Sequence, residues 1–529
     1  MTRSGKPPAT PTGWEQEVAA IAERRRRAEE LGGADGVARQ HAAGRWTIRE
    51  RIDRLIDPGS FCEQGPIAGH AELAEDGSLA SFTPANYVLG LAGIDGRLCA
   101  VGGEDFTQRG GSPTPAGLRK SVYAEDLALR YRVPLVRFLE GGGGSVGGTK
   151  RGRGDAGGDP VYSRARFASI AEAMATVPVV SAAVGPVAGF PAARLAASHF
   201  SLMVRGTAQV MVAGPAIVER ALGDACSKEE LGGAAVHAAS GVVDNIASSE
   251  REACQQIRTF LGYLPGNVWE RAPHRPGADD PLRQQEELLS LVPRDRRRAY
   301  DMRQLICLVV DDGSWFEIGA TYGLGQIVGL ARLDGHTVGV LASDPNHYAG
   351  AMSALGAQKY RRFIDLCDTF HLPIVSFVDE PGFMIGREAE AQATIRHGTS
   401  LLFAVMQSTV PWASVIVRKT YGVAAAAHFG RDAYVVSWPS AEAGALPVEG
   451  GVAVAFRREI AAAADPEQRR RELEEAFAGG RSPFPRAEAF GVHDLIDPRT
   501  TRPLLCEWVA CIRPLIDSQL GPRTYAIRP

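Results

Sequence analysis

Short apolar runs alternate with amphipathic segments along two long stretches of the chain. In the first stretch the pattern predicts two strands joined by a turn at Asp95-Gly96, a helix over about 114–131, and buried strands over 134–139 and 179–184. The last strand is expected to end at Gly185-Pro186 and to lead into a helix of small residues. Strands separated by helices are typical of a layered α/β structure.

The second stretch repeats the first at a nearly constant distance. The segment Gly90-Leu-Ala-Gly-Ile-Asp-Gly96 returns as Gly329-Leu-Ala-Arg-Leu-Asp-Gly335, an offset of 239 residues (329 − 90). At the same offset the strand that ends in Glu140 falls on the strand that ends in Asp379. Solenoid repeats have periods of about 20–50 residues, so this repeat indicates a duplicated whole domain.

The duplication predicts the domain organisation. Two similar domains are expected over residues 46–264 and 294–529, and two domains also suit a chain of 529 residues. A polar linker rich in proline and arginine is expected over 265–293, and an N-terminal tail and helix over 1–45. Domains of this kind can face each other and build a site from equivalent loops, which suits a reaction between two large substrates.

The composition is that of a soluble globular protein, with 45% hydrophobic and 22% charged residues. A formal net charge of −3 without a basic stripe argues against nucleic-acid binding. The most apolar segments, 177–197 and 401–427, are interrupted by Gly, Pro, Arg or Lys, so no membrane span is expected. The eight cysteines include no Cys-x-x-Cys pair, so we expect no metal site, and without a signal sequence the expected location is cytoplasmic.

Two pairs of glycine-containing loops are the candidates for chemistry. The first pair follows equivalent buried strands and consists of a glycine run after Glu140 and the segment Asp379-Glu-Pro-Gly-Phe383. The second pair, Gly185-Pro-Val-Ala-Gly-Phe190 and Arg418-Lys-Thr-Tyr-Gly-Val-Ala424, is expected to lie between a strand and an alanine-rich helix. Glycines let backbone N–H groups point at an oxyanion, and the first turn of a helix leaves N–H donors without partners. The alternatives are a flexible surface loop for the first pair and close helix packing for the second.

Motifs of several other enzyme classes are absent from the sequence. It has no His-Glu-x-x-His pair and no Walker-type loop, and its histidines are scattered. A site rich in backbone donors and poor in side-chain bases indicates an enzyme that positions reactants whose own groups carry much of the chemistry.

Several segments are specific enough to identify a family. They include the entry segment Arg49-Glu-Arg-Ile-Asp-Arg-Leu-Ile-Asp-Pro-Gly-Ser-Phe61, then Asp105-Phe-Thr-x-x-Gly-Gly-Ser112, Glu230-Leu-Gly-Gly-Ala234, Val378-Asp-x-Pro-Gly-Phe383, Ile395-Arg-His-Gly398 and Val417-Arg-Lys-x-Tyr-Gly422. Over nearly its whole length the chain resembles the carboxyltransferase (β) subunits of biotin-dependent acyl-CoA carboxylases, the propionyl-CoA, acetyl-CoA and methylcrotonoyl-CoA group.

The resemblance implies a fold, an assembly and a reaction. The fold would be two tandem crotonase-like spiral domains of the ClpP/crotonase superfamily, and the assembly a homo-hexamer built as a trimer of dimers. The reaction would transfer CO₂ from carboxybiotin to the α-carbon, or a vinylogous carbon, of a coenzyme A thioester. The chain has no Met-Lys-Met biotinylation site, so a partner α subunit with biotin carboxylase and biotin carboxyl carrier functions would supply the biotin. Active sites would lie at the dimer interface, between the N-half of one chain and the C-half of another.

The resemblance also assigns site residues. The amides of Gly142 and Gly143, aided by the turn at Gly189, would form one oxyanion hole, and those of Val423 and Ala424 would form the other. One hole would hold the thioester enolate and the other the ureido oxygen of biotin. The remaining substrate-binding positions would be Gly111, Gly382, Phe383 and Gly422, with Ala426 in the wall of the acyl pocket.

Two loops depart from the family pattern. The family commonly has Asp-Ser-Gly-Gly-Ala-Arg where this chain has Glu140-Gly-Gly-Gly-Gly-Ser145, and Tyr-Gly-Gly-Ala-Tyr where it has Tyr421-Gly-Val-Ala-Ala425. Backbone donors survive both changes, since every residue except proline has an N–H. The small Ala426 predicts that acyl groups longer or bulkier than propionyl are accepted.

Other functions are open at this stage. The chain could be the carboxyltransferase component of an acyl-CoA decarboxylase or transcarboxylase, or an inactive scaffold homologue. A crotonase-type hydratase or isomerase needs only one such domain, so it does not explain the duplication.

Overall fold

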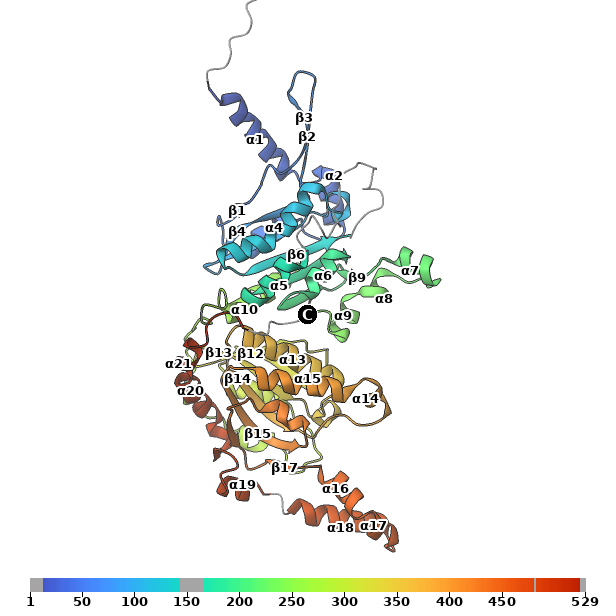
Figure 1. Cartoon of the computed structure of the whole chain (residues 1–529), viewed down its shortest axis with the longest axis vertical. Coiled ribbons are helices and arrows are strands. Elements are labelled where there is room, and N and C mark those ends of the chain that lie inside the picture. The colour runs from blue at the N-terminus through green and yellow to red at the C-terminus, as the bar shows by residue number, and fades with distance from the viewer. Residues whose placement is uncertain (1–12, 143–165, 480–481, 524–529) are drawn as a thin grey trace, which may run out of the picture.

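The computed structural model describes residues 13–142, 166–479 and 482–523, and they form two halves stacked along the long axis (Figure 1). Each half contains an 8-stranded mixed sheet. The N-half sheet has the order β1-β4-β5-β6-β7-β8-β10, with β9 paired to β7, and the C-half sheet has the order β11-β12-β13-β14-β15-β16-β18, with β17 paired to β15. The two sheets therefore have the same topology, strand for strand.

The strands of the N-half are β1 (Cys62–Glu63), β4 (Tyr87–Ile94), β5 (Arg97–Glu104), β6 (Leu135–Gly141), β7 (Val179–Ala188), β8 (Phe200–Val204), β9 (Gln209–Met211) and β10 (Asn245–Ala247). Those of the C-half are β11 (Phe316–Ile318), β12 (Gln326–Leu333), β13 (His336–Ser343), β14 (Ile374–Glu380), β15 (Trp412–Tyr421), β16 (Tyr434–Ser437), β17 (Glu442–Gly444) and β18 (Asp494–Leu495).

The strand registers confirm the internal duplication. Gly90 of β4 pairs with Val101 of β5, and Gly329 of β12 pairs with Val340 of β13. Both residues of the first pair therefore have their counterparts in the second pair at the same sequence offset. The pairing of β6 with β7 is interrupted by a bulge after Leu139, and that of β14 with β15 by a bulge after Val378. A bulge bends a strand and redirects the residues that follow it, so both halves turn their chains at the same point before the candidate loops.

The helices lie between strands and at the chain ends. The N-terminal helices are α1 (Glu15–Glu29), α2 (Gly33–Ala42) and α3 (Ile48–Leu55), and those of the N-half are α4 (Pro115–Tyr131), α5 (Arg166–Thr176), α6 (Phe190–Ala196), α7 (Pro215–Leu222), α8 (Lys228–Gly232), α9 (Ala234–Ser240) and α10 (Glu250–Tyr263). Those that follow are α11 (Leu288–Leu291), α12 (Met302–Val309), α13 (Ala354–Thr369), α14 (Arg387–Ala391), α15 (Thr394–Gln407), α16 (Val448–Ala455), α17 (Arg457–Ala462), α18 (Pro466–Gly479), α19 (Phe484–Glu488), α20 (Thr501–Cys511) and α21 (Arg513–Asp517). Short 3-10 turns include η1 (Arg109–Gly111), η3 (Tyr348–Gly350) and η4 (Ala424–His428).

One hydrophobic core contains residues from both halves. Phe200 of β8 stacks on Phe260 of α10 with ring centroids 4.8 Å apart, and its ring meets that of Phe316 in β11 at 5.5 Å. An ion pair also joins the two halves: Arg362 of α13 is paired with Asp244 of the N-half. The two sheets are therefore joined by a packed core.

The structure corrects two local predictions. Strand β7 does not end at Gly185-Pro186 but continues to Ala188. Proline is compatible with the strand there because β7 changes neighbours: it pairs with β8 up to Ala183 and with β9 from Pro186 onward. In the C-half, the alanine-rich segment after Gly422 is the five-residue 3-10 turn η4 rather than a longer helix.

A separate hairpin was not predicted. Strands β2 (Gly69–Leu73) and β3 (Leu79–Pro84) pair with each other outside the two large sheets. Most of their side chains are exposed or half-buried, which explains why their apolar pattern is weak.

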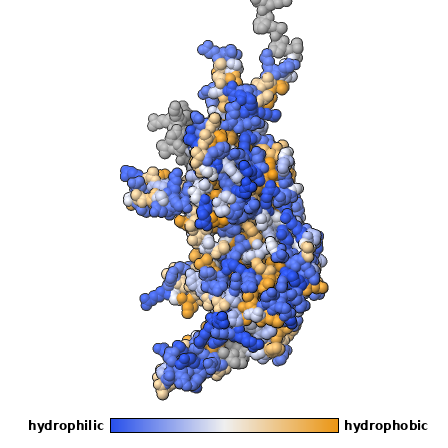
Figure 2. All heavy atoms as spheres, turned by 180° about the vertical axis from the view of Figure 1, so that it is seen from behind, coloured by the Kyte–Doolittle hydropathy of each residue, from blue (hydrophilic) through white to orange (hydrophobic). Residues whose placement is uncertain are grey.

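Several helices project from one side of the molecule, namely α7, α14 and the group α16 to α18 (Figure 1). Seen from behind, hydrophobic atoms are scattered over the body, while the projection at the lower end is mostly hydrophilic (Figure 2). Among the described residues, no helix combines the length and the apolar character that crossing a bilayer requires.

Candidate functional site

The first candidate loop lies at a cavity in the N-half. Strand β6 ends at Gly141, and Gly142 lines a cavity of about 140 Å³ together with Gly111 of η1 and Phe190 of α6. Three segments that are distant in sequence thus meet at the end of the parallel strands. Gly143 lies outside the described residues.

Backbone geometry explains the glycine at position 111. Its φ is +69°, and a Cβ placed there would lie 2.4 Å from the carbonyl oxygen of Glu140. Only glycine fits such a close approach with a left-handed φ. The N–H of Gly142 donates a long hydrogen bond of 3.3 Å to the carbonyl oxygen of Gly110, so an oxyanion would have to replace this acceptor.

The turn at Gly189 brings helix α6 to the same cavity. Gly189 has φ 66° and ψ −129°, and it immediately precedes the first helical residue, Phe190. Phe190 and Pro191 form one wall of the cavity, and Leu118 of α4 lies in another part of the lining. Apolar walls with a few polar groups are typical of sites that bind small molecules.

Sequence reasoning missed the acid that lines this cavity, Glu104 of β5. Burial raises the pKa of Glu104 above its ordinary value, with Arg194 acting in the opposite direction. One carboxylate oxygen accepts the N–H of Glu140 at 3.3 Å. The cavity therefore has a polar floor as well as apolar walls.

A buried ion network supports α6 from below. Glu125 of α4 pairs with Arg137 of β6 and with Arg194 of α6, each at 2.9 Å. Arg137 also donates to the hydroxyl of Ser198 and to the carbonyl oxygen of Ala197. Because buried charges are costly unless fully paired, this network fixes the position of α6 beside the cavity. The charged Arg137 inside an otherwise apolar strand is the sequence signal that could have revealed it.

The C-half loop that follows β14 is held by a hydrogen bond to Glu380, the last residue of that strand. Gly382 has φ +126°, and its N–H donates to Glu380 Oε1 at 2.9 Å. Its carbonyl oxygen accepts the N–H of Met352 at 3.0 Å. The ring of Phe383 lies against Gly398, where an added Cβ would approach it to 2.4 Å. Gly382 and Phe383 are thus held in place, and the pairing of Phe383 with Gly398 explains two of the family-specific motifs.

The turn after β15 contains four of the predicted residues, and three of them are exposed. Gly422 has φ +62°, and Val423 immediately precedes η4, with its carbonyl oxygen accepting the N–H of Ala426 at 3.1 Å. Gly422, Val423 and Ala426 are exposed, whereas Ala424 is fully buried. The first N–H groups of a helical turn have no acceptor within that turn, so the exposed start of η4 can offer donors to a ligand.

A buried polar group lies under η4. Glu380 Oε2 has no hydrogen-bond partner among the described residues and lies 3.5 Å from Nε2 of His428, whose Nδ1 is 2.8 Å from the hydroxyl of Ser376. Burial raises the pKa of Glu380 well above its usual range and lowers the pKa of His428 to about 3. His428 is therefore neutral near pH 7, and burial favours the protonated form of Glu380. Neither was singled out from the sequence.

The acids at the ends of the two equivalent strands have different partners. Glu140 pairs with Arg51 of α3 at 2.5 Å and with Arg45 at 2.9 Å, which ties the N-terminal helices to the end of β6. Its counterpart Asp379 pairs with Arg418 of β15 at 2.9 Å. In both halves a fully buried carboxylate thus anchors the start of the candidate loop.

The structure therefore groups the predicted residues into two sets. Gly111, Gly142 and the Gly189 turn meet at the N-half cavity. Gly422, Val423, Ala424 and Ala426 form one turn in the C-half, while Gly382 and Phe383 follow the neighbouring strand β14. The lining of the N-half cavity comes entirely from the N-half.

Comparison with known proteins identifies the relatives of the chain. The carboxyl transferase domain family matches residues 39–511. The carboxyltransferase subunit of propionyl-CoA carboxylase from Haloferax mediterranei is 35% identical over 498 residues, which cover 92% of this chain and 94% of that protein. The α subunit of methylmalonyl-CoA decarboxylase from Veillonella parvula is 34% identical over 489 residues, covering 91% and 92%.

A solved structure shows the same fold. The crystal structure of transcarboxylase 12S, a hexamer with methylmalonyl-coenzyme A and methylmalonic acid bound, matches with a TM-score of 0.84 and 31% identity over 98% of this chain and 97% of that chain. The expectation of two tandem crotonase-like domains is thereby confirmed. Together with the family match over most of its length, this likeness shows that the chain belongs to the carboxyl transferase domain family and is an enzyme of the transferase class.

Proposed function

We propose that this carboxyltransferase moves a carboxyl group between biotin and the α-carbon of an acyl-CoA thioester. The observation that carries the proposal is the pair of equivalent turns that follow β7 and β15. The turn after β7 lies at an apolar cavity, and the turn after β15 leads into the partly exposed η4. The relatives named for propionyl-CoA carboxylase and methylmalonyl-CoA decarboxylase support acyl-CoA substrates.

The N-half loops suit the thioester. The cavity beside Gly142 has walls from Leu118 and Phe190 that can receive an acyl group, and Gly111 allows close approach of the backbone. An enolate oxygen needs preorganised N–H donors where its charge develops. In this proposal the Gly142 N–H, released from the Gly110 carbonyl, and the donors at Gly143 and the Gly189 turn supply them.

The C-half turn suits biotin. When bound, carboxybiotin supplies the carboxyl group and a ureido group that can accept the substrate proton. A ureido oxygen needs N–H donors, and in this proposal they come from the exposed Val423, which precedes η4, and from the adjacent, buried Ala424. Burial favours the uncharged forms of Glu380 and of His428, the last residue of η4, so it opposes a negative charge beside the ureido oxygen. The chain's residues thus act by orienting the reactants and stabilising oxygen charge.

We place each complete site between two chains, in a hexamer built as a trimer of dimers. Three apolar side chains at or next to the projecting helices are exposed: Leu222 at the end of α7 by 78%, Val212 before α7 by 98% and Ile385 before α14 by 90%. Clusters of exposed apolar residues mark interaction surfaces. The hexameric transcarboxylase 12S supports the same assembly.

The proposal includes the domain boundaries and the partner. The two crotonase-like domains would span 46–264 and 294–529, with a linker at 265–293 and a tail and helix at 1–45. The biotin would be attached to a partner α subunit, because the chain has no Met-Lys-Met site.

A second candidate is the same transfer run in the opposite direction, as the carboxyltransferase component of a decarboxylase. The match to the methylmalonyl-CoA decarboxylase subunit favours it as strongly as the carboxylase matches favour the first. Purification of the native complex distinguishes the two: a biotin carboxylase subunit supports the carboxylase, and its replacement by other biotin-carrying subunits supports the decarboxylase.

The purified full chain tests the chemistry itself. Incubation with methylmalonyl-CoA and free biotin should convert the thioester to propionyl-CoA in a biotin-dependent manner, measured by chromatography. A chain that forms oligomers but gives no biotin-dependent conversion with any malonyl-type thioester would be an inactive scaffold, and the proposal would fail.

Ala426, contributed to the N-half cavity by the C-half of the facing chain, is the proposed determinant of acyl size. Its side chain is exposed on η4 next to Val423, and an isoleucine there would fill space that longer acyl groups occupy. Because each buried methylene contributes about 0.8 kcal/mol, Ala426→Ile should shift kcat/KM toward acetyl- and propionyl-CoA by roughly tenfold or more. The measurement is kcat/KM over a series of acyl-CoAs, and an unchanged ranking would remove Ala426 from the pocket wall.

A further inference from the structure

Two charged side chains in the N-half cavity are almost fully buried and only partly paired. Glu104 of β5 is 7% exposed and Arg194 of α6 is 1% exposed, and both line the cavity of about 140 Å³ beside Gly142. Charged groups inside a protein are costly unless they have partners. Their unused hydrogen-bonding atoms therefore indicate what kind of ligand the cavity receives.

Glu104 faces the cavity from the sheet. It is the last residue of β5 and pairs with Tyr87 of β4, so the two side chains leave the sheet on the same face, and both line the cavity. Its Oε2 accepts the N–H of Glu140 at 3.3 Å. Its Oε1 makes no hydrogen bond to another described residue and is not enclosed by protein, so one carboxyl oxygen remains for a ligand.

Arg194 reaches the same cavity from helix α6. Its guanidinium lies over the ring of Phe190, which forms a wall of the cavity, at 4.7 Å from the ring centroid. Its Nη2 donates to the carbonyl oxygen of Ser121 and to Glu125, whereas its Nη1 makes no hydrogen bond to a described residue. One nitrogen of the guanidinium is therefore also left for a ligand.

Glu104 and Arg194 are near each other but do not form an ion pair. Burial raises the pKa of Glu104, and the nearby charge of Arg194 opposes that rise. A hydroxyl group between the two side chains can bond to both of them. It accepts from Arg194, and it either donates to an ionised Glu104 or accepts from a protonated one, so it suits both states of the acid.

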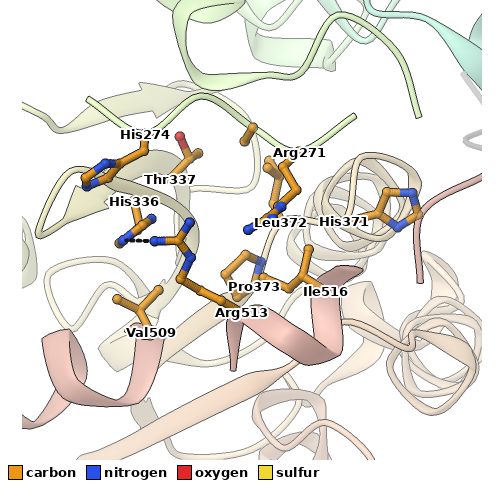
Figure 3. Close-up of a pocket in the computed structure, with 11 residues that line it drawn as sticks. Arg271, His274, His336, Thr337, His371, Leu372, Pro373, Val509, Arg513 and Ile516 are labelled. Atoms are coloured by element: carbon orange, nitrogen blue, oxygen red, sulfur yellow. Dashed lines mark hydrogen bonds between the residues drawn. The ribbon is translucent and has the colours of Figure 1, made fainter. Parts of the chain in front are cut away.

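A second cavity, of about 160 Å³, lies between the segment 271–274, β13 and α21 (Figure 3). Its basic side chains already contact protein partners. Arg513 donates to Nε2 of His336 at 3.3 Å, and the rings of His336 and His274 stack with centroids 4.1 Å apart. Arg271 is paired with Asp517 at 2.6 Å. The N-half cavity differs, because its acid and its guanidinium each keep an atom for a ligand.

The size of the N-half cavity limits the acyl chain that it can hold. At about 30 Å³ per water in the liquid, a volume of about 140 Å³ corresponds to roughly four or five non-hydrogen atoms. Apolar walls from Leu118 and Phe190 suit the methylenes of such a chain, and the two charged groups suit an oxygen on it.

We propose that the substrate is a short acyl-CoA with a hydroxyl group near the end of its acyl chain, and that Glu104 and Arg194 bind this hydroxyl. The inference rests on the proposed function, since it places the acyl group of the thioester in the N-half cavity. A site that hydrogen-bonds a substrate hydroxyl discriminates against the analogue without it, because the polar groups of the site then lose their partner. Glu104 is thus a specificity-determining residue for the acyl group.

Calorimetric titration of the full chain with acyl-CoA thioesters, in the absence of biotin, tests the assignment. 4-Hydroxybutyryl-CoA should bind about tenfold or more tightly than pentanoyl-CoA, in which a methyl group replaces the hydroxyl. Glu104→Leu should remove this preference, whereas Glu104→Gln keeps a hydrogen-bonding side chain and should retain most of it. The matched control is Glu75→Leu, which makes the same change at an exposed position between β2 and β3 and should leave the preference unchanged.

Leu118→Phe is a second variant, which leaves both charged groups in place. Because it narrows the cavity, it should weaken the binding of 4-hydroxybutyryl-CoA and of pentanoyl-CoA several-fold, while acetyl-CoA binds as before. Unchanged affinities for all three thioesters would show that the acyl chain does not enter this cavity, and the proposal would fail even if Glu104→Leu did not fold.

The proposal is also overturned if the wild type binds the hydroxylated and the methyl-terminated thioester equally, or if Glu104→Leu, folded by circular dichroism, keeps the preference. Tighter binding of succinyl-CoA than of 4-hydroxybutyryl-CoA would assign the two groups to a carboxylate and overturn the hydroxyl. These results leave the biotin-dependent conversion of methylmalonyl-CoA untouched. A chain that binds no acyl-CoA at all, propionyl-CoA included, would instead contradict the proposed function.

Discussion

At the scale of single residues, Val423 offers the sharpest test of a backbone donor. Its φ of −72° lies within the range that proline adopts, so Val423→Pro removes the N–H with little change in the turn. Turnover should fall by roughly 10²–10³, the usual effect of losing one oxyanion donor. Val423→Gly keeps the N–H and should retain most of the activity. Steady-state kinetics of both variants, with circular dichroism as the check on folding, measures the difference, and equal activities would refute the assignment.

Amide substitution of two neighbouring acids, Asp379 and Glu380, should change the stability to very different extents. Asp379 is ion-paired with buried Arg418, so Asp379→Asn leaves an unpaired buried charge and should lower the free energy of unfolding by about 3–5 kcal/mol. Burial raises the pKa of Glu380 and so favours its protonated form, which an amide resembles, so Glu380→Gln should change the free energy of unfolding by less than about 1 kcal/mol. Denaturant unfolding at pH 7 measures both effects.

The raised pKa of Glu380 also predicts a pH dependence with a definite sign. Above the ordinary value of 4.5 the unfolded chain releases the Glu380 proton, while the folded chain keeps it up to the raised pKa. The native state then holds the extra proton, so this group makes stability fall as pH rises through that window. Glu380→Gln removes this contribution, and its stability relative to wild type should therefore increase from pH 5 to pH 8. A constant difference would contradict the protonated state.

At the scale of elements, the 3-10 turns η1 and η3 are locked to the ends of the two equivalent strands. A Cβ on Gly111 would lie 2.4 Å from the Glu140 carbonyl oxygen, and one on Gly350, with φ +88°, would lie 2.7 Å from that of Asp379. Gly111→Ala and Gly350→Ala should each lower the free energy of unfolding by about 1–3 kcal/mol, the cost of a strained backbone position.

Gly214 provides the matched control, because it has an ordinary extended backbone and no neighbour within 4 Å of an added Cβ. Gly214→Ala should therefore leave the unfolding midpoint nearly unchanged. Similar losses in all three variants would show that the close approach at η1 and η3 is not what requires glycine.

The sequence predicted elements whose pattern is locally determined. The strands around Asp95-Gly96 and the helix near residues 114–131 appear where expected, because periodicity and turn chemistry specify them. The end of β7 was wrong because Pro186 is tolerated only through a change of neighbouring strands, which is a tertiary property. The short η4 was missed for the same reason, since alanines favour a helix unless packing stops it.

The candidate site was predicted in part. The glycine loops could be found, because positions such as Gly111 have a backbone requirement that only glycine meets. The supporting groups could not, because Glu104 and His428 acquire their roles only through contacts with distant strands and turns.

At the scale of the whole molecule, the proposed sites between chains can be tested by mixing inactive variants. Gly142→Pro removes an N-half donor and Val423→Pro a C-half donor. If each site joins the N-half of one chain to the C-half of another, subunit exchange at equal amounts should restore about a quarter of the sites, since only mixed dimers contain an intact pair. Turnover before and after exchange measures this. No recovery, with exchange verified by mass-tagged subunits, would mean that each site is built within one chain.

The core shared by the two halves limits how the duplicated domains can diverge. Phe200 of the N-half packs on Phe316 of the C-half, so a substitution at this boundary alters both domains at once. We therefore expect the packing of the two sheets to tolerate less change than the loops that lie away from this boundary. The same position under the loop holds an arginine–glutamate network around Arg137 in one copy and an acid–imidazole pair near Ser376 in the other. On the proposed assignment, this difference lets two copies of one scaffold receive different reactants.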